Sequence, residues 1–263
     1  MINDSFSLRR VGMLYNFYSP AIRLILIISA AVVLGSYILC LYGAHMSMRY
    51  GMQIPFFLSY TIGSTAVGWI YYLGPFVLVG VKDRGITTVL PASWQEKSAF
   101  VLSWTFVLYP LFLAVMWYGP MALCSLFTDA ANVNETMLTV TGVRNEGFDL
   151  SSLMNKSGVY NIAQNVMVAS MTLFVIISSR RNRLAHGVAA CIISVVALGL
   201  AGVAVGIFAG VKAAFAAKAG AEIDGQELVA YIFNSLKYGA WIVVAVAVML
   251  VVASVWKIKN RQN

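Results

Sequence analysis

Six long apolar runs constrain the fold of this chain more than any other feature of its sequence. Each run holds about 20 or more mostly apolar residues, the length that an α-helix needs to cross the hydrocarbon core of a bilayer. A backbone in lipid has to satisfy its own hydrogen bonds, so we expect an all-α, polytopic membrane protein with six transmembrane helices. The expected spans are Leu24–Gly43, Pro55–Val81, Ala99–Leu126, Val159–Ser178, Ala185–Gly210 and Tyr238–Trp256.

The runs differ in length and in proline content. The second, third and fifth are longer than a bilayer requires, so we expect them to tilt, bend or project beyond it. Pro75 lies inside the second run, and Pro110 and Pro120 lie inside the third. Because a proline inside a helix removes a backbone donor and clashes with the preceding turn, each of the three is a predicted kink.

The Lys and Arg residues between the runs predict the orientation. The net charge of +8 does not indicate a nucleic-acid partner, because the basic residues gather in short clusters between apolar runs, which is how topology is specified. If both termini are cytoplasmic, as we expect, the cytoplasmic side holds 12 of the 18 Lys and Arg residues. These are Arg9, Arg10, Arg23, Lys82, Arg84, Lys97, Arg180, Arg181, Arg183, Lys257, Lys259 and Arg261.

A polar and aromatic leader, residues 1–22, precedes the first run, and it lacks the pattern of a cleavable signal peptide. Its segment Ser5–Ile22 mixes aromatic and aliphatic residues with Arg9 and Arg10, which predicts an amphipathic helix along the inner membrane surface. A disordered basic leader is the alternative. Pro20 marks the expected bend into the first span.

The sequence contains no motif for catalysis, metal binding or a cofactor. HExxH, GxSxG and the Gly-Lys pair of a Walker A loop are all missing, so we expect no catalytic residue, no metal site and no cofactor. Any ATP hydrolysis is then expected on a separate polypeptide. His45 and His186 lie at span ends on opposite sides of the membrane and cannot share one metal. The spans carry no charge in their central portions, which disfavours a proton-coupled carrier but leaves an uncharged, carbonyl-lined ion site open.

The cytoplasmic loop between the second and third runs, residues 82–97, says most about function. Ser93 and Glu96 have the spacing of a capping box, so the helix of the third span is expected to begin near Ser93. Ile86 and Leu90, among polar neighbours, fit a short amphipathic turn that meets a soluble partner. From the residues alone, a plain solvated connector is the alternative.

Residues 83–97 read Asp-Arg-Gly-Ile-Thr-Thr-Val-Leu-Pro-Ala-Ser-Trp-Gln-Glu-Lys. This pattern resembles the loop between spans two and three in permease subunits of ABC exporters of the type-2 class, although Ile86 separates Gly85 from Thr87 and Pro91 follows the leucine directly. The resemblance implies a coupling helix that docks on a separate ATP-binding cassette ATPase at a bacterial cytoplasmic (inner) membrane. The implied coupling residues are Asp83, Arg84, Gly85, Thr87, Leu90, Pro91, Ser93, Glu96 and Lys97.

A second motif lies in the fifth run, where Gly202, Gly206 and Gly210 repeat every four residues. Small residues at this spacing let two helices approach closely in lipid. From the residues alone, packing within the monomer and a subunit interface explain the stripe equally well. The resemblance favours the interface, because half-transporters of this class pair through spans one and five, and it implies a homodimer or a heterodimer with a related permease.

These observations predict a single transmembrane domain over residues 1–263. Its outer side is expected to carry a large loop, residues 127–158, and an outer or re-entrant segment, residues 211–237, for which the resemblance implies two short helices. The leading hypothesis is a permease subunit of an ATP-powered exporter. A non-transporting membrane assembly or sensor component, and a secondary carrier with an uncharged site, are the alternatives.

Overall fold

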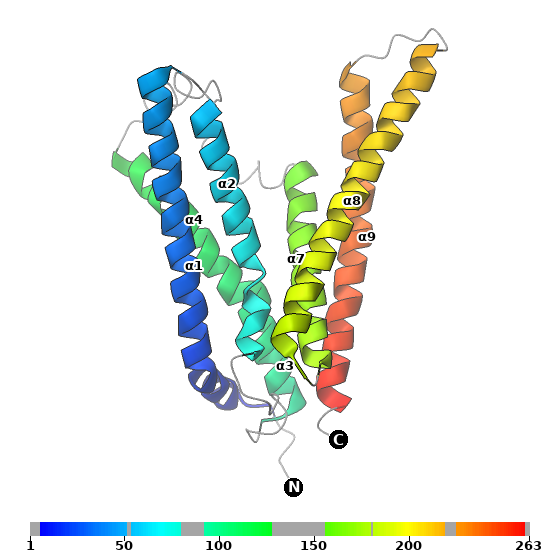
Figure 1. The fold of residues 1–263 in the computed structure, drawn as a ribbon. Helices are drawn as coiled ribbons and strands as arrows, with labels where there is room; N and C mark the ends of the chain where they lie inside the picture. Colours follow the sequence, from blue (N-terminus) through cyan, green and yellow to red (C-terminus); the bar gives the residue numbers. More distant parts are fainter. Residues whose placement is uncertain are drawn as a thin grey trace. The chain divides into compact units, whose positions relative to one another are not determined.

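A computed structural model describes residues 6–51, 54–79, 92–127, 156–179, 181–218 and 225–260. Within these ranges the chain is helical and contains no strand, as expected from the apolar runs (Figure 1). Its contacts divide it into two compact units, residues 1–149 and 150–263, which are described separately. The elements are α1 (Leu8–Tyr50), α2 (Ile54–Tyr71), η1 (Gly74–Leu78), α3 (Trp94–Ser103), η2 (Trp104–Leu108), α4 (Tyr109–Phe127), α7 (Lys156–Ser178), α8 (Arg183–Lys218) and α9 (Gly225–Asn260).

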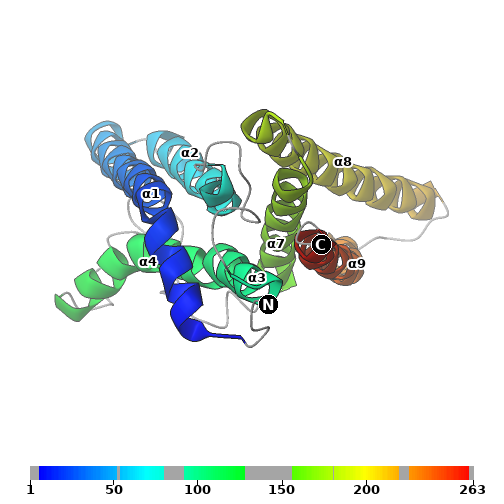
Figure 2. The same cartoon turned by 90° about the horizontal axis from the view of Figure 1, so that it is seen from below.

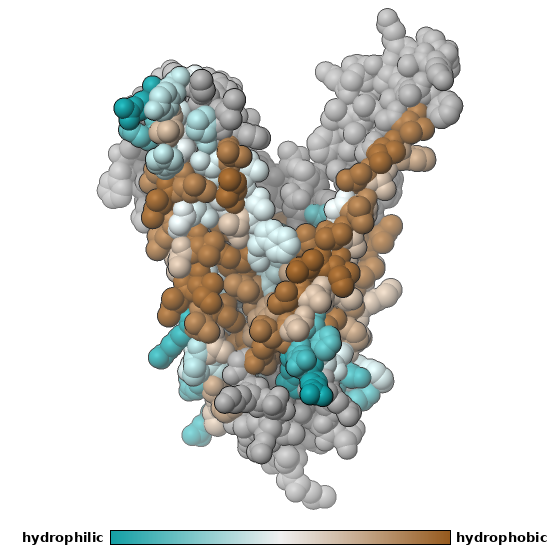
Figure 3. Space-filling model, viewed as in Figure 1, coloured by the Kyte–Doolittle hydropathy of each residue, from teal (hydrophilic) through white to brown (hydrophobic). Residues whose placement is uncertain are grey.

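Long apolar helices in both units indicate a multi-pass membrane protein. Within the described residues, 4 helices are long and apolar enough to cross a bilayer, and Ile162–Ser178 is a shorter apolar helix. Figure 3 shows hydrophobic side chains along α1 and α2 and, in the second unit, along α8. Large apolar side chains that water would disfavour are largely exposed there, which suits a lipid surround. Examples are Leu24, Ile27 and Ile38 on α1 and Ile193, Leu200 and Phe208 on α8.

In the first unit, α1 and α2 lie side by side and approach closely because their facing residues are small (Figures 1 and 2). The hydroxyl oxygen of Ser36 lies 3.3 Å from the carbonyl oxygen of Gly63. A Cβ at Gly43 would lie 2.3 Å from the Ser59 hydroxyl oxygen and 2.9 Å from the Pro55 carbonyl oxygen. This crossing therefore has no room for a methyl group at Gly43.

The leader forms the first turns of α1 and is not a separate helix. α1 runs from Leu8 through Pro20 to Tyr50, and its N-terminal end turns aside in Figure 1. A proline inside a helix is the usual cause of such a bend, and it need not end the helix. The leader packs against α3: Tyr18 is buried and its ring stacks on Phe100 with centroids 5.0 Å apart. The expected contact with the membrane surface stays a prediction.

The second expected span is broken, as Pro75 predicted. α2 ends at Tyr71, and the chain continues as the 3₁₀ helix η1, with Pro75 in its first turn. Such a break frees backbone carbonyls, which protein donors have to satisfy in lipid. The indole Nε1 of Trp104 donates to the carbonyl of Gly74 at 2.9 Å, and the hydroxyl of Tyr109 donates to the carbonyl of Ile70 at 2.7 Å.

A π-helical turn in the third expected span places these two donors together. In η2 the backbone N–H of Tyr109 donates to the carbonyl of Trp104, five residues earlier. This wider turn brings residues five apart toward one face, whereas an α-helix would separate them. Trp104 and Tyr109 are both buried, with ring centroids 5.7 Å apart. The turn ends immediately before Pro110, which has no N–H to donate, while α4 continues through Pro120 as a helix.

In the second unit, α7 packs against both α8 and α9. α7 ends at Ser178, and α8 begins at Arg183, after Asn182 in the left-handed region with φ 54°, which asparagine tolerates better than most residues. α8 continues through Lys218, and α9 is helical from Gly225. The described parts of residues 211–237 are therefore extensions of two long helices, where two separate short helices were expected.

Candidate functional site

The described part of the predicted coupling loop begins at Ala92 and contains the expected capping box. The backbone N–H of Glu96 donates to the Ser93 hydroxyl oxygen at 3.4 Å, and the backbone N–H of Ser93 donates to Glu96 Oε2 at 2.9 Å. Two backbone donors at the start of α3 are thereby satisfied reciprocally. The capping-box prediction is confirmed, and α3 begins one residue after Ser93.

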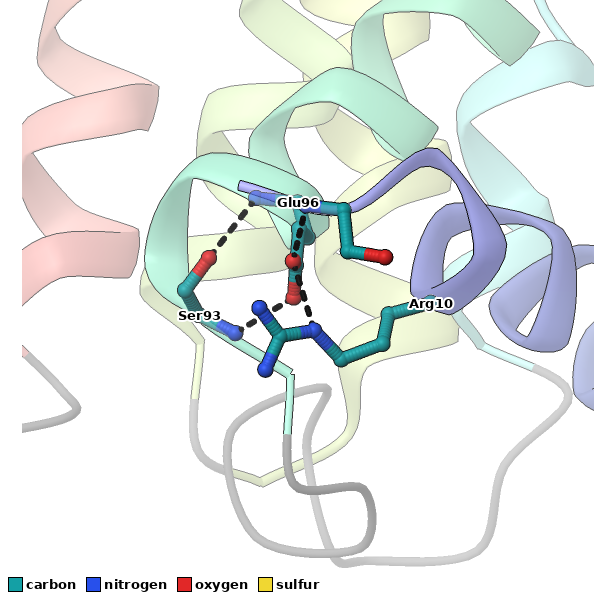
Figure 4. A network of polar contacts seen from close by, with 4 residues as sticks. Arg10, Ser93 and Glu96 are labelled. Atoms are coloured by element: carbon teal, nitrogen blue, oxygen red, sulfur yellow. Dashed lines mark hydrogen bonds and ion pairs between the residues drawn. The ribbon is translucent and has the colours of Figure 1, made fainter. Parts of the chain in front are cut away.

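The other oxygen of the same carboxylate binds the start of α1. Glu96 Oε1 accepts hydrogen bonds from the backbone N–H of Ser7 at 2.7 Å and from Arg10 Nε at 2.8 Å. Figure 4 shows Arg10, Ser93 and Glu96 converging, with dashed lines marking these contacts. We call Ser7, Arg10, Ser93 and Glu96 the Glu96 joint, because one side chain ties together residues 86 positions apart.

Burial makes the joint strong. The Glu96 side chain is 0% exposed and that of Arg10 is 24% exposed, so the carboxylate has no contact with water while the guanidinium keeps some. A buried charge is costly unless donors surround it, and this one accepts two backbone N–H groups and one Nε–H. The joint therefore fixes the start of α3 against the leader and carries a mechanical link between them.

Aromatic contacts extend the joint along α1 and α3. The Tyr15 hydroxyl lies 2.7 Å from the Ser103 hydroxyl oxygen, and the Tyr15 ring meets Phe100 edge-on with centroids 4.7 Å apart. Leu14, next to Tyr15 on α1, is buried, as is Phe100. The leader and α3 thus move as one packed body and not as two segments joined at a single point.

The sequence identified half of this joint. Of the predicted coupling residues, Ser93 and Glu96 belong to it, and Lys97 is buried beside it. Residues 83–91 lie outside the described residues. Ser7 and Arg10 were missed as partners of Glu96. Their only signal in the sequence was that few acidic residues accompany the many arginines of the predicted cytoplasmic side, and that signal does not identify which arginine pairs with Glu96.

The side chains of the Glu96 joint hold two helix starts together, and none of them is placed to react with a substrate. Its arginine and carboxylate are consumed by each other and by the helix start, which leaves neither poised for proton transfer. Among the residues that the structure describes, His, Cys, Asp and Glu side chains form no cluster of three or more that could hold a metal ion.

The glycine stripe of the fifth run divides into two parts. Ala190 and Ser194, about three and two turns before Gly202 on α8, are buried within the chain. At Gly202 an added Cβ would have nothing within 4 Å. Gly206 and Gly210 lie in α8, but their surroundings are outside the described residues. Packing within the chain therefore accounts for the beginning of the stripe and leaves Gly202 open.

Comparisons with protein-family models, with curated proteins and with solved structures returned no match to this chain.

Proposed function

We propose that this chain is the membrane-spanning permease subunit of an ATP-powered, ABC-type exporter in a bacterial cytoplasmic membrane, and that a separate ATPase subunit supplies the energy. The Glu96 joint carries this proposal. Residues 82–97 end in a helix start that is tied through Glu96 to the leader. A partner that pushes on this loop moves α3 and the beginning of α1 together, which is what coupling to an ATPase requires.

The joint also supports the first two crossings of the proposed topology, which has six spans and cytoplasmic termini. Ser7 and Ser93 bind one carboxylate, so the chain is at the same end of the first unit before α1 and before α3. An even number of crossings must separate these points, and α1 with α2–η1 supplies two. The excess of Lys and Arg around residues 9–23 and 82–97 then favours the cytoplasm for this end.

The broken second span argues against the secondary-carrier alternative. Carriers with broken helices use the freed carbonyls to coordinate ions. Here the carbonyls of Ile70 and Gly74 already accept hydrogen bonds from Tyr109 and Trp104. In this structure protein donors occupy both carbonyls, so the break has the character of a structural element more than that of an ion site.

The proposal includes a dimer, homomeric or with a related permease, whose interface contains Gly202. Gly202→Leu should lower the dimer fraction of the purified protein at least about ten-fold, because a leucine keeps two helices from close approach. The monomer should stay folded, since the space around Gly202 is open within the chain. Ala204→Leu, exposed on the opposite side of α8, is the matched control. Size-exclusion chromatography with light scattering that finds equal dimer fractions for both variants would exclude this interface.

Capture of the ATPase tests the function itself. A tagged chain purified from its own host should bring down a P-loop ATPase that has no membrane domain, and Arg84→Glu in the loop should reduce the amount by at least about ten-fold, as expected for loss of one interfacial charge contact. Arg49→Glu, a charge reversal on the predicted outer side, is the control and should reduce nothing. Repeated purification without such an ATPase would favour the assembly or sensor alternative.

A further inference from the structure

A chain of three hydroxyl contacts joins α1 to the break in the second span. The Tyr109 hydroxyl lies 2.7 Å from the carbonyl oxygen of Ile70 and 2.8 Å from the hydroxyl oxygen of Ser29. The Ser29 hydroxyl in turn lies 2.7 Å from the carbonyl oxygen of Ile25. Both side chains are 0% exposed, so water does not take part.

These three contacts share two protons. The carbonyls can only accept, and each hydroxyl carries one proton that it donates once. In one arrangement Tyr109 donates to Ile70, and Ser29 donates to Tyr109 or to Ile25. In the other, Tyr109 donates to Ser29, and Ser29 donates to Ile25. Both arrangements use every donor, and they differ in whether the carbonyl of Ile70 is held by Tyr109.

We propose that Tyr109 and Ser29 form a two-position latch on the α2–η1 break. When the Tyr109 hydroxyl donates to the Ile70 carbonyl, the α2–η1 break is held closed. When the Tyr109 hydroxyl donates to Ser29 instead, the Ile70 carbonyl keeps only its hydrogen bond from the N–H of Leu73, at 2.8 Å. The α2–η1 break is then free to open. Because neither position leaves a donor unpaired, the change costs little, which is the property that a bistable element needs.

The α2–η1 break is weakly held by its own backbone hydrogen bonds. η1 is held by 3₁₀-type hydrogen bonds, which have poorer geometry than those of an α-helix. Pro75 supplies no backbone donor to bridge the break. Gly74 lets the latch reach its target: a Cβ there would lie 2.8 Å from the Tyr109 ring. Tyr109 lies on the continuous helical segment α3–η2–α4, which begins at the Glu96 joint, so movement of α3 is transmitted to Tyr109.

Hydrogen exchange of the purified chain in detergent tests the latch without any ATPase, so its outcome is independent of the proposed function. Tyr109→Phe keeps the ring and removes the donor, and amides of residues 72–79 should exchange about five-fold faster, the size of one net hydrogen bond. Ser29→Ala removes the second acceptor, and the same amides should exchange about five-fold slower, because the open position then leaves Tyr109 unpaired.

The opposite directions distinguish a latch from a tyrosine that merely supports the fold. Tyr37→Phe is the matched control, since the Tyr37 hydroxyl also donates to a backbone carbonyl of the first unit, that of Trp117, away from the joint. It should leave exchange of residues 72–79 unchanged. Amides of residues 32–42 in α1, which belong to the same unit, report overall unfolding of that unit. Faster exchange at residues 72–79 in both Tyr109→Phe and Ser29→Ala, or no change in either, would overturn the latch.

Discussion

Glu96→Ala is expected to lower the free energy of unfolding by about 3 kcal/mol, the lower end of the range for breaking a buried ion pair. The substitution removes the acceptor for the N–H groups of Ser7 and Ser93 and takes the carboxylate from Arg10. The lower end applies because Arg10 is 24% exposed and gains some hydration when the carboxylate is lost. Unfolding of the purified protein by SDS titration, followed by circular dichroism, measures this change.

Two variants show whether the loss belongs to the joint. Gln95→Ala changes an exposed neighbour on the same helical turn and should cost less than about 0.5 kcal/mol. Arg10→Ala should cost less than Glu96→Ala, because the carboxylate then keeps the backbone N–H groups of Ser7 and Ser93. The double variant should cost less than the sum of the two, because both remove the same ion pair. If Glu96→Ala unfolds at the same SDS fraction as Gln95→Ala, the joint does not stabilise the protein.

Gly43→Ala is expected to lower the free energy of unfolding by about 2 kcal/mol, as overpacking of a filled site does. The new methyl would lie 2.6 Å from the Cβ of Ser59 and 2.9 Å from the Pro55 carbonyl oxygen. The Ser59 hydroxyl cannot turn away without loss, since it donates to that same carbonyl at 2.8 Å. The backbones of α1 and α2 must therefore separate to admit the methyl group.

Gly35→Ala, in the same helix, is the matched control for Gly43→Ala. A Cβ at Gly35 would have nothing within 4 Å, so this substitution should leave stability unchanged or raise it slightly through the better helix propensity of alanine. The SDS titration described for Glu96 compares the two variants. Equal stability of the two would mean that α1 and α2 do not cross closely at Gly43.

The sequence predicted those features that depend on neighbours along the chain. Run length and composition predicted that the described parts of the six expected spans are helical, apart from the break in the second, and the spacing of Ser93 and Glu96 predicted the capping box. The break near Pro75 followed from a single residue that cannot donate. Each of these outcomes is decided within a few residues, so one sequence suffices to infer it.

Features that depend on distant partners could not be predicted. The ion pair of Arg10 with Glu96 spans 86 positions, and no local pattern selects this arginine among its basic neighbours. The π-helical turn at Trp104–Leu108 carries Trp104 and Tyr109 to carbonyls 30 and 39 positions away, and no local pattern shows these partners. Pro20 was expected to mark a bend, and the sequence did not show that the helix continues through it or that Tyr18 stacks on Phe100, 82 positions away.

The extent of α8 and α9 was also beyond the sequence. The alanine-rich segment after Gly210 and the segment before Tyr238 both favour helix, but their composition does not say whether each forms a separate helix or extends a long one. In the structure each segment extends a long helix, and α8 and α9 have 36 residues each, about 54 Å, well beyond the hydrocarbon core. The composition of these segments therefore did not predict that α8 continues to Lys218 or that α9 begins at Gly225.

The central claim, that residues 82–97 contact an ATPase, is tested most directly by site-specific photo-crosslinking in membranes of the native host. A photoreactive amino acid at Thr87 should form an adduct in which mass spectrometry identifies a P-loop ATPase without its own membrane domain. The same group at Thr136, in the predicted outer loop, should form none. Adducts at Thr87 that contain no ATPase, or an ATPase adduct formed only from Thr136, would contradict the account.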